Sequence, residues 1–175
     1  MLPDDYLRVM IMKRRTFVLS TLILGINPLF IARVMGGEMN TAASITQIHK
    51  SDAEWRRLLT PEQYNILRKQ GTEPPNSSPL NNEKRHGTFV CAGCELPLFT
   101  SEMKYDSGTG WPSFFTTLPD SVETKRDFRL ILPRTEYHCA RCGGHQGHIF
   151  NDGPQPTGKR YCNNGLALQF IPTAS

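Results

Sequence analysis

The sequence of 175 residues lacks an even number of cysteines, a long uninterrupted apolar run and a large excess of one charge. Its five cysteines cannot all pair, so disulfides alone would leave one thiol over. The apolar stretch 17–32 is short and is interrupted by Gly25, Asn27 and Pro28, which makes it a poor membrane span. The chain has no low-complexity tract. Its length and composition fit one domain after a detachable leader.

The charge balance argues against a nucleic-acid partner. The formal net charge is +4 for the whole chain, and it falls to +2 when residues 1–39 are left out. Proteins that bind nucleic acids carry basic stripes or clusters of Arg and Lys interleaved with aromatic residues, and no such pattern occurs here. We therefore expect no nucleic acid among the partners.

The first 39 residues resemble a signal peptide. A basic segment, Met12-Lys-Arg-Arg15, precedes the apolar stretch, and Arg14-Arg15-Thr-Phe-Val-Leu19 fits the twin-arginine export pattern. We expect Met12 to be the true start, residues 1–39 to form the leader, residues 40–50 a linker and residues 51–172 the domain. This organisation predicts a periplasmic or otherwise exported bacterial protein without stable membrane association after cleavage. An uncleaved membrane anchor and a cytoplasmic protein are the alternatives.

Four cysteines form two Cys-x-x-Cys pairs, Cys91 with Cys94 and Cys139 with Cys142. Two such pairs can place four thiolates tetrahedrally around one ion, as in closed structural zinc sites. Two disulfides in an oxidising compartment, or iron held by the same sulfurs, remain open. With four protein ligands, a zinc ion has no open position for catalysis. We therefore predict one structural Zn²⁺.

Local patterns predict a mainly β domain of the α+β class, with short peripheral helices at its N-terminal side. Ser51 to Glu54 and Thr60 to Gln63 fit capping boxes, and Gly71 is expected to end the second helix. Short β-prone runs follow, separated by Gly and Pro turns, and indicate antiparallel sheets. These runs cover residues 87–90, 128–132, 135–138, 148–150 and 166–171.

Three further segments could carry chemistry. Trp111, between Gly110 and Pro112, could form a rigid apolar wall with a polar N–H, or could simply pack in the core. His145 and His148 lie close together beside the second cysteine pair, where one could donate a proton near neutral pH, although isolated histidines are usually structural.

The third segment contains the fifth cysteine, Cys162, in Arg160-Tyr-Cys-Asn-Asn164. Alternation along an extended strand would place Arg160 and Cys162 on one face. A neighbouring cation favours the nucleophilic thiolate, so this pattern predicts a reactive thiol. A buried, inert cysteine is the alternative.

These motifs, in this order, resemble the methionine-R-sulfoxide reductases, the B-type family, from residue 51 to residue 172. The resemblance implies two antiparallel sheets with peripheral helices and a zinc ion on the four paired cysteines. It implies an enzyme that reduces the R epimer of methionine sulfoxide in oxidised proteins or peptides, as part of the repair of oxidative damage. It also implies a thiol reductant, and we expect a monomer.

The resemblance further assigns roles to individual residues. Cys162 would attack the sulfoxide sulfur and become a sulfenic acid. The implied catalytic residues are Cys162, His145, His148, Arg160 and Asn164. The implied substrate-binding residues are Trp111, Phe114 and Phe150. The implied metal ligands are Cys91, Cys94, Cys139 and Cys142.

One departure from the family pattern concerns turnover. Many relatives carry a resolving cysteine before the Gly-Trp-Pro motif, and this chain has Thr109 at that position. No cysteine precedes Cys91 either. We therefore expect an external thiol, either a thioredoxin-like protein or a small dithiol, to reduce the sulfenic acid directly.

Two other classes of protein fit parts of the pattern. A zinc-ribbon binding module would display loops to a partner, and Cys162→Ser would leave its function intact. A periplasmic redox or metal-handling protein would use Cys91 to Cys142 as exchangeable dithiols and would release its metal under mild oxidation.

Overall fold

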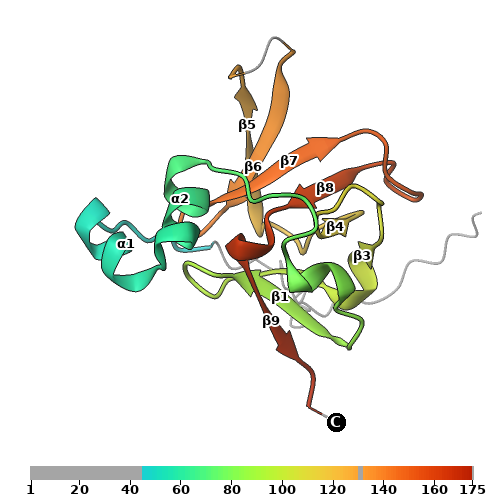
Figure 1. Cartoon of the computed structure of the whole chain (residues 1–175), viewed down its shortest axis with the longest axis horizontal. Helices are drawn as coiled ribbons and strands as arrows, with labels where there is room; N and C mark the ends of the chain where they lie inside the picture. The colour runs from blue at the N-terminus through green and yellow to red at the C-terminus, as the bar shows by residue number, and fades with distance from the viewer. Residues whose placement is uncertain (1–44, 130–131, 175) are drawn as a thin grey trace, which may run out of the picture. The chain divides into compact units, whose positions relative to one another are not determined.

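Two antiparallel β-sheets form the framework of the domain in the computed structural model, which describes residues 45–129 and 132–174 (Figure 1). The smaller sheet has the order β2 (Pro97–Thr100), β1 (Gly87–Cys91) and β9 (Leu168–Pro172). The larger sheet has the order β3 (Lys104–Tyr105), β4 (Ser113–Phe114), β8 (Arg160–Asn163), β7 (His145–Phe150), β6 (Arg134–Cys139) and β5 (Val122–Asp127). The predicted fold class is confirmed. The expected leader and its start at Met12 lie outside the described residues.

Two short helices precede the sheets, α1 (Asp52–Leu58) and α2 (Pro61–Lys69). Both predicted capping boxes are present: the Ser51 backbone N–H donates to Glu54 Oε2 at 2.8 Å, and the Gln63 N–H donates to Thr60 Oγ1 at 3.2 Å. These bonds satisfy N–H groups that a helix start otherwise leaves unpaired.

Among the described residues, no helix is both long and apolar enough to cross a membrane.

The expected end of α2 at Gly71 is wrong by one residue. The residue with left-handed backbone is Gln70, at φ 57°, and helix α2 ends at Lys69. The Gly71 N–H then donates to the Asn65 carbonyl at 2.9 Å. The φ of Gly71 lies outside the left-handed region, and a Cβ there would lie 2.4 Å from Asn65 Nδ2, so the Asn65 side chain would have to move to admit one.

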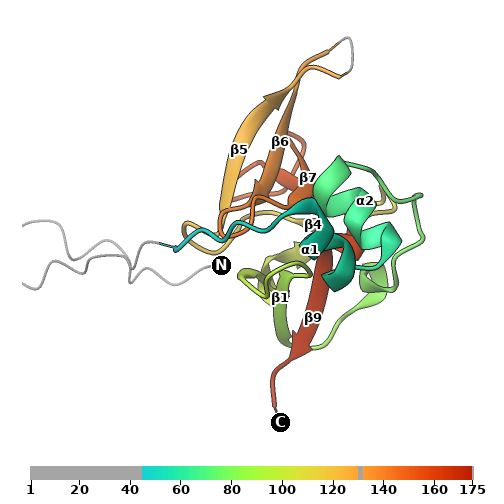
Figure 2. The same cartoon turned by 90° about the vertical axis from the view of Figure 1, so that its left-hand side faces the viewer.

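Aromatic side chains from both sheets fill the core. Phe99 of β2 stacks on Phe114 of β4 with ring centroids 3.9 Å apart, and Tyr137 of β6 approaches Phe99 edge-on at 6.4 Å. Helix α1 adds Trp55, and α2 packs against β7 and the 3₁₀ turn η3 (Gly165–Ala167). Figure 2 shows both helices gathered on one side of the sheets. Burial of these large apolar surfaces is the main driving force for the fold.

The strand expected at residues 128–132 does not form in the part of this segment that the structure describes. The strand in this region is β5, which ends at Asp127, just before the expected segment. Phe128 and Leu132 lie in the connection from β5 to β6, with 72% and 78% of their surfaces exposed. Strand β5 pairs only with β6 at the sheet edge, and its hairpin projects from the body of the domain (Figure 1). Most of its side chains therefore face solvent, and its sequence shows no apolar alternation.

Candidate active site and metal centre

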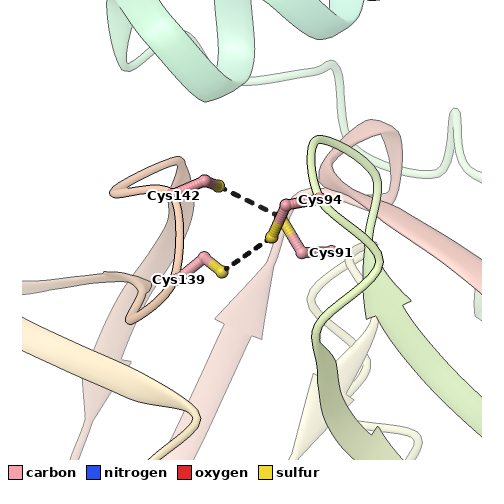
Figure 3. A group of neighbouring side chains, drawn as sticks. All are labelled: Cys91, Cys94, Cys139 and Cys142. Atoms are coloured by element: carbon pink, nitrogen blue, oxygen red, sulfur yellow. Dashed lines mark hydrogen bonds between the residues drawn. The ribbon is translucent and has the colours of Figure 1, made fainter. Parts of the chain in front are cut away.

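The four paired cysteines meet between the two sheets. Cys91 ends β1 of the smaller sheet and Cys139 ends β6 of the larger one, and each pair is completed in the turn that follows (Figure 3). The sulfur of Cys91 lies 3.7 Å from that of Cys142, and the sulfur of Cys94 lies 3.5 Å from that of Cys139. All four ligand atoms lie within 4.8 Å of one another.

This spacing fits a tetrahedral zinc ion. Zn–S bonds of about 2.3 Å place sulfurs about 3.8 Å apart in a tetrahedron, which agrees with the distances across the two pairs. All five cysteines are free, so the sulfurs are not consumed in disulfides. The four cysteines therefore form a structural zinc site, which joins the ends of strands from different sheets.

The fifth cysteine lies at the centre of the larger sheet. Strand β8 runs between β4 and β7, and Cys162 is directly opposite Ser113 on one side and His148 on the other. Side chains of directly paired residues lie on the same face with Cβ atoms about 4.5–5.5 Å apart. Strand register thus brings a thiol and an imidazole together.

A cavity of about 130 Å³ opens above this pair. Its walls include most of the residues that the sequence singled out. They are Trp111, His148, Phe150, Cys162 and Asn164, together with Thr72, Arg134, Gly147 and Asn163. The lining offers more apolar than polar surface, as expected for a site that receives a small, weakly polar group.

His148 is held by a buried carboxylate. Its Nε2 lies 2.7 Å from Asp127 Oδ2, which also accepts a hydrogen bond from Arg134 at 2.7 Å. Burial lowers the pKa of His148, and the bond to Asp127 only partly opposes this effect. The backbone N–H of Arg129, followed by His148 and Arg134, holds the pKa of Asp127 well below its usual range against the effect of burial. The imidazole is therefore neutral near pH 7, with Nδ1 as the nitrogen left for the cavity.

The Arg160 charge favours the Cys162 thiolate, as the sequence predicts, but burial has a larger effect in the opposite direction. Burial raises the pKa of the Cys162 thiol above 9.0, and the Arg160 charge and a hydrogen bond from Thr109 offset this only in part. The guanidinium is shared, because it makes two 2.8 Å bonds to Asp152 and lies over the Phe150 ring at 4.3 Å. At neutral pH the resting site therefore holds a thiol beside a neutral imidazole.

Two of the expected site residues lie behind the cavity. Phe114 is fully buried between Phe89 and Phe99 and is not part of the cavity wall. His145 is 2% exposed, and its Nδ1 lies 2.9 Å from Glu136 Oε1. Its ring centroid is 5.4 Å from that of His148, so it supports the second imidazole and does not face the cavity.

Sequence reasoning missed Glu73, which ties the cavity walls together. Its backbone carbonyl accepts a hydrogen bond from Trp111 Nε1 at 3.1 Å, and its N–H donates to Asn164 Oδ1 at 3.1 Å. Its buried carboxylate accepts the N–H groups of Gly165 and Leu166 at 2.5 and 3.0 Å. The only signal was an acidic residue in a Gly- and Pro-rich loop, a pattern that usually indicates a solvated surface.

Comparisons with known proteins agree with this geometry. The SelR domain matches residues 59–172. The chain is 52% identical over 127 residues to "Peptide methionine sulfoxide reductase MsrB" of Agrobacterium fabrum, covering 72% of this chain and 94% of that protein. Proteins of the same name from Leifsonia xyli and Methanosarcina barkeri are 54% and 50% identical, with 72% and 70% of this chain and 92% and 87% of theirs covered. Over most of its length, therefore, the chain belongs to the SelR domain family.

Proposed function

We propose that this protein reduces methionine sulfoxide in oxidised proteins and peptides to methionine, and that it acts on the R epimer. The observation that carries the proposal is the Cys162–His148 pair beneath a cavity walled by Trp111 and Phe150. A thiol is the nucleophile, an imidazole can move the proton, and aromatic rings can receive the methyl group. The relatives that share about half of the sequence are named for the same activity.

The pKa directions at the site suggest how the reaction starts. Neutral His148 takes the proton of Cys162, and the resulting thiolate attacks the sulfoxide sulfur. The imidazolium, held by Asp127, returns the proton to the departing oxygen. The protonated oxygen then moves from the substrate sulfur to Cys162 Sγ while the bond between the two sulfurs breaks. Methionine leaves, and Cys162 is a sulfenic acid. The protein ends the step with its proton balance unchanged.

Regeneration requires two thiols from outside the chain. The other four cysteines are zinc ligands, and the residue beside Cys162 is Thr109, whose hydroxyl hydrogen-bonds to the thiol. One external thiol condenses with the sulfenic acid to form a mixed disulfide and water, and a second thiol releases Cys162 as a thiol. A thioredoxin-like protein or a small dithiol could supply both.

The experiment that tests the function offers the protein a mixture of R and S methionine sulfoxide in one peptide, with dithiothreitol as reductant. We expect the R epimer to be consumed and the S epimer to persist. Chromatography of the two diastereomers measures each separately. If the zinc-loaded, folded protein consumes neither epimer, the proposal is wrong and a binding module becomes the better interpretation.

The one-cysteine cycle predicts the product of a single turnover without reductant. We expect one oxygen atom on Cys162, trapped as a dimedone adduct in the mass spectrum of the intact protein. We expect no intramolecular disulfide, because no free thiol remains. A disulfide between Cys162 and any zinc-ligand cysteine would contradict this cycle.

The His148–Asp127 pair predicts the acid limb of the pH profile. Protonation of His148 removes the base, and burial lowers the pKa of this group below 6.5. We therefore expect kcat/KM to be flat near neutrality and to fall only at lower pH. Asp127→Asn removes a contribution that raises the pKa of His148, so the limb should move to still lower pH, and kcat should fall by about a hundredfold. Initial rates between about pH 4.5 and 8.5, roughly two units either side of the ordinary histidine pKa, measure both effects.

Asp52→Asn serves as the matched control, because it makes the same charge change on the exposed helix α1. It should leave the profile in place. An acid limb that does not move in Asp127→Asn would show that His148 is not the proton carrier.

A further inference from the structure

Trp111 is shared by two cavities. The second one, which we call the lysine cavity, has a volume of about 260 Å³, and its walls include Lys84, Lys104, Tyr105, Asp106 and Trp111. Trp111 therefore lies where the active-site cavity and the lysine cavity adjoin. A ligand that is bound over Cys162 and extends past Trp111 reaches the lysine cavity.

The lysine cavity carries a positive charge. Two of its lining residues are lysines, and the single carboxylate, Asp106, accepts the N–H of Gly108 at 2.9 Å. The nearby carboxylate of Glu83 is already paired with Arg85 at 2.6 Å. The lining therefore carries one more positive than negative charge, and this excess would attract an anion that enters the cavity.

The ammonium group of Lys104 is held in a position from which it could bind such an anion. Its Nζ donates one hydrogen bond to the Asn81 carbonyl at 2.8 Å, which positions the ammonium group and leaves two further donors. Burial lowers the pKa of Lys104 and the charge of Lys84 acts in the same direction, whereas the carboxylates of Asp106 and Glu83 partly oppose both effects. A partly desolvated cation binds an anion more strongly than one in open solvent does.

The walls also contain polar atoms without a partner. Tyr105 Oη and Asn81 Oδ1 are both buried and make no hydrogen bond to the described residues. Buried polar groups are normally satisfied by protein, water or ligand. A substrate bound in the cavity would reach these two atoms only if the wall moved, so the proposal below rests on the lysines and not on them.

The lysine cavity is close to the reacting atoms. Burial raises the pKa of the Tyr105 hydroxyl, and the Arg160 charge, together with that of Cys162 when it is a thiolate, is close enough to act on it. Strand β3, which carries Lys104 and Tyr105, pairs with β4, and β4 pairs with β8 beside Cys162. Only two strand steps therefore separate the cavity from the nucleophile.

We propose that the lysine cavity binds the polypeptide segment next to the methionine sulfoxide and selects substrates with Asp or Glu in that segment. This inference rests on the proposed function and gives it a sequence preference. The sulfoxide side chain enters over Cys162, the main chain crosses at Trp111, and the acidic side chain pairs with Lys84 and Lys104.

The test compares peptides that contain one methionine sulfoxide and differ only at the residue before it or the residue after it. Each of these two positions is occupied in turn by Asp, Ala or Lys. Each kcat/KM is divided by that of N-acetyl-methionine sulfoxide amide, a substrate too small to reach the lysine cavity. On one side of the sulfoxide, we expect Asp to exceed Lys by about tenfold in the wild-type protein, as one charge-assisted contact provides. The preference should shrink as salt is raised.

Variants of the two lysines then test whether the preference for acidic over basic peptides arises in the lysine cavity. Lys84→Gln and Lys104→Gln should each reduce the ratio of Asp to Lys peptides toward one, and Lys84→Glu should invert it. Gln at position 104 can still donate to the Asn81 carbonyl, which protects the local structure. Lys50→Gln, with the same charge change just before α1, should keep the full preference.

Each other outcome has a definite meaning. Turnover of the small amide with no charge preference among peptides would overturn the subsite alone, whereas no turnover of either the amide or the peptides would overturn the reductase itself. If the lysine variants change the KM for a small anionic thiol and not the peptide ratio, the lysine cavity serves the reductant and the inference is wrong.

Discussion

Cys162→Ser is expected to abolish sulfoxide reduction, with a loss of about a thousandfold or more in kcat. The hydroxyl of serine is a much weaker nucleophile than a thiolate, and His148 is too weak a base to ionise it. The fold should survive, because Cys162 lies at the cavity and outside the zinc site. Steady-state rates with dithiothreitol, zinc content and the thermal midpoint of the same sample measure all three quantities.

The matched control for this variant is Ser113→Ala, which changes the other cross-strand neighbour of Cys162. It removes hydroxyl contacts to Ser107 and to the Trp111 carbonyl without removing the thiol. It should retain measurable turnover. If Cys162→Ser retains activity within about tenfold of the wild type, a different nucleophile carries the reaction.

Loss of the zinc ion is expected to unfold the domain. Structural zinc sites contribute about 10–16 kcal/mol of apparent binding free energy in small peptides, whereas whole domains are stable by about 5–15 kcal/mol. Removing the metal also leaves four thiols crowded between the sheets. We therefore expect Cys139→Ser, or the wild-type protein with a strong chelator, to lose its cooperative thermal transition.

The Cys162→Ser variant separates this effect from the mere loss of a thiol, because it should keep both the ion and the transition. Zinc stoichiometry and calorimetry on the same samples make the comparison. A chelated protein that keeps its thermal midpoint and its activity would contradict a structural role for the metal.

Local chemistry explains which features the sequence could predict. Capping boxes at Ser51 and Thr60 depend on residues three apart, so the helix starts were correct. The zinc ligands were also predicted correctly, because the two cysteines of each pair are only three residues apart in the sequence. The place of Arg160 and Cys162 on one strand also followed from alternation.

Features that depend on long-range contacts were missed. Strand β5 is recognised only by its pairing with β6, since its own side chains are mostly exposed. Glu73 contacts Gly165 and Leu166 more than 90 positions later in the chain. The protonation of Cys162 depends on burial, which no pentapeptide reveals. The effect of Arg160 on the pKa of Cys162 has the predicted direction, but the sequence did not show that burial opposes it more strongly.

The position of the metal ligands along the chain has a consequence for its topology. Cys94 and Cys139 are 45 residues apart, and the ion closes the segment between them into a loop. Closing a loop of this length removes conformational entropy worth about 4 kcal/mol from the unfolded chain, by analogy with a disulfide. Trp111 and Asp127 lie inside the loop, whereas His148 and Cys162 lie beyond it. The ion therefore holds a closed loop, which carries Trp111 of the cavity wall, against the rest of the domain, which carries Phe150 and the nucleophile.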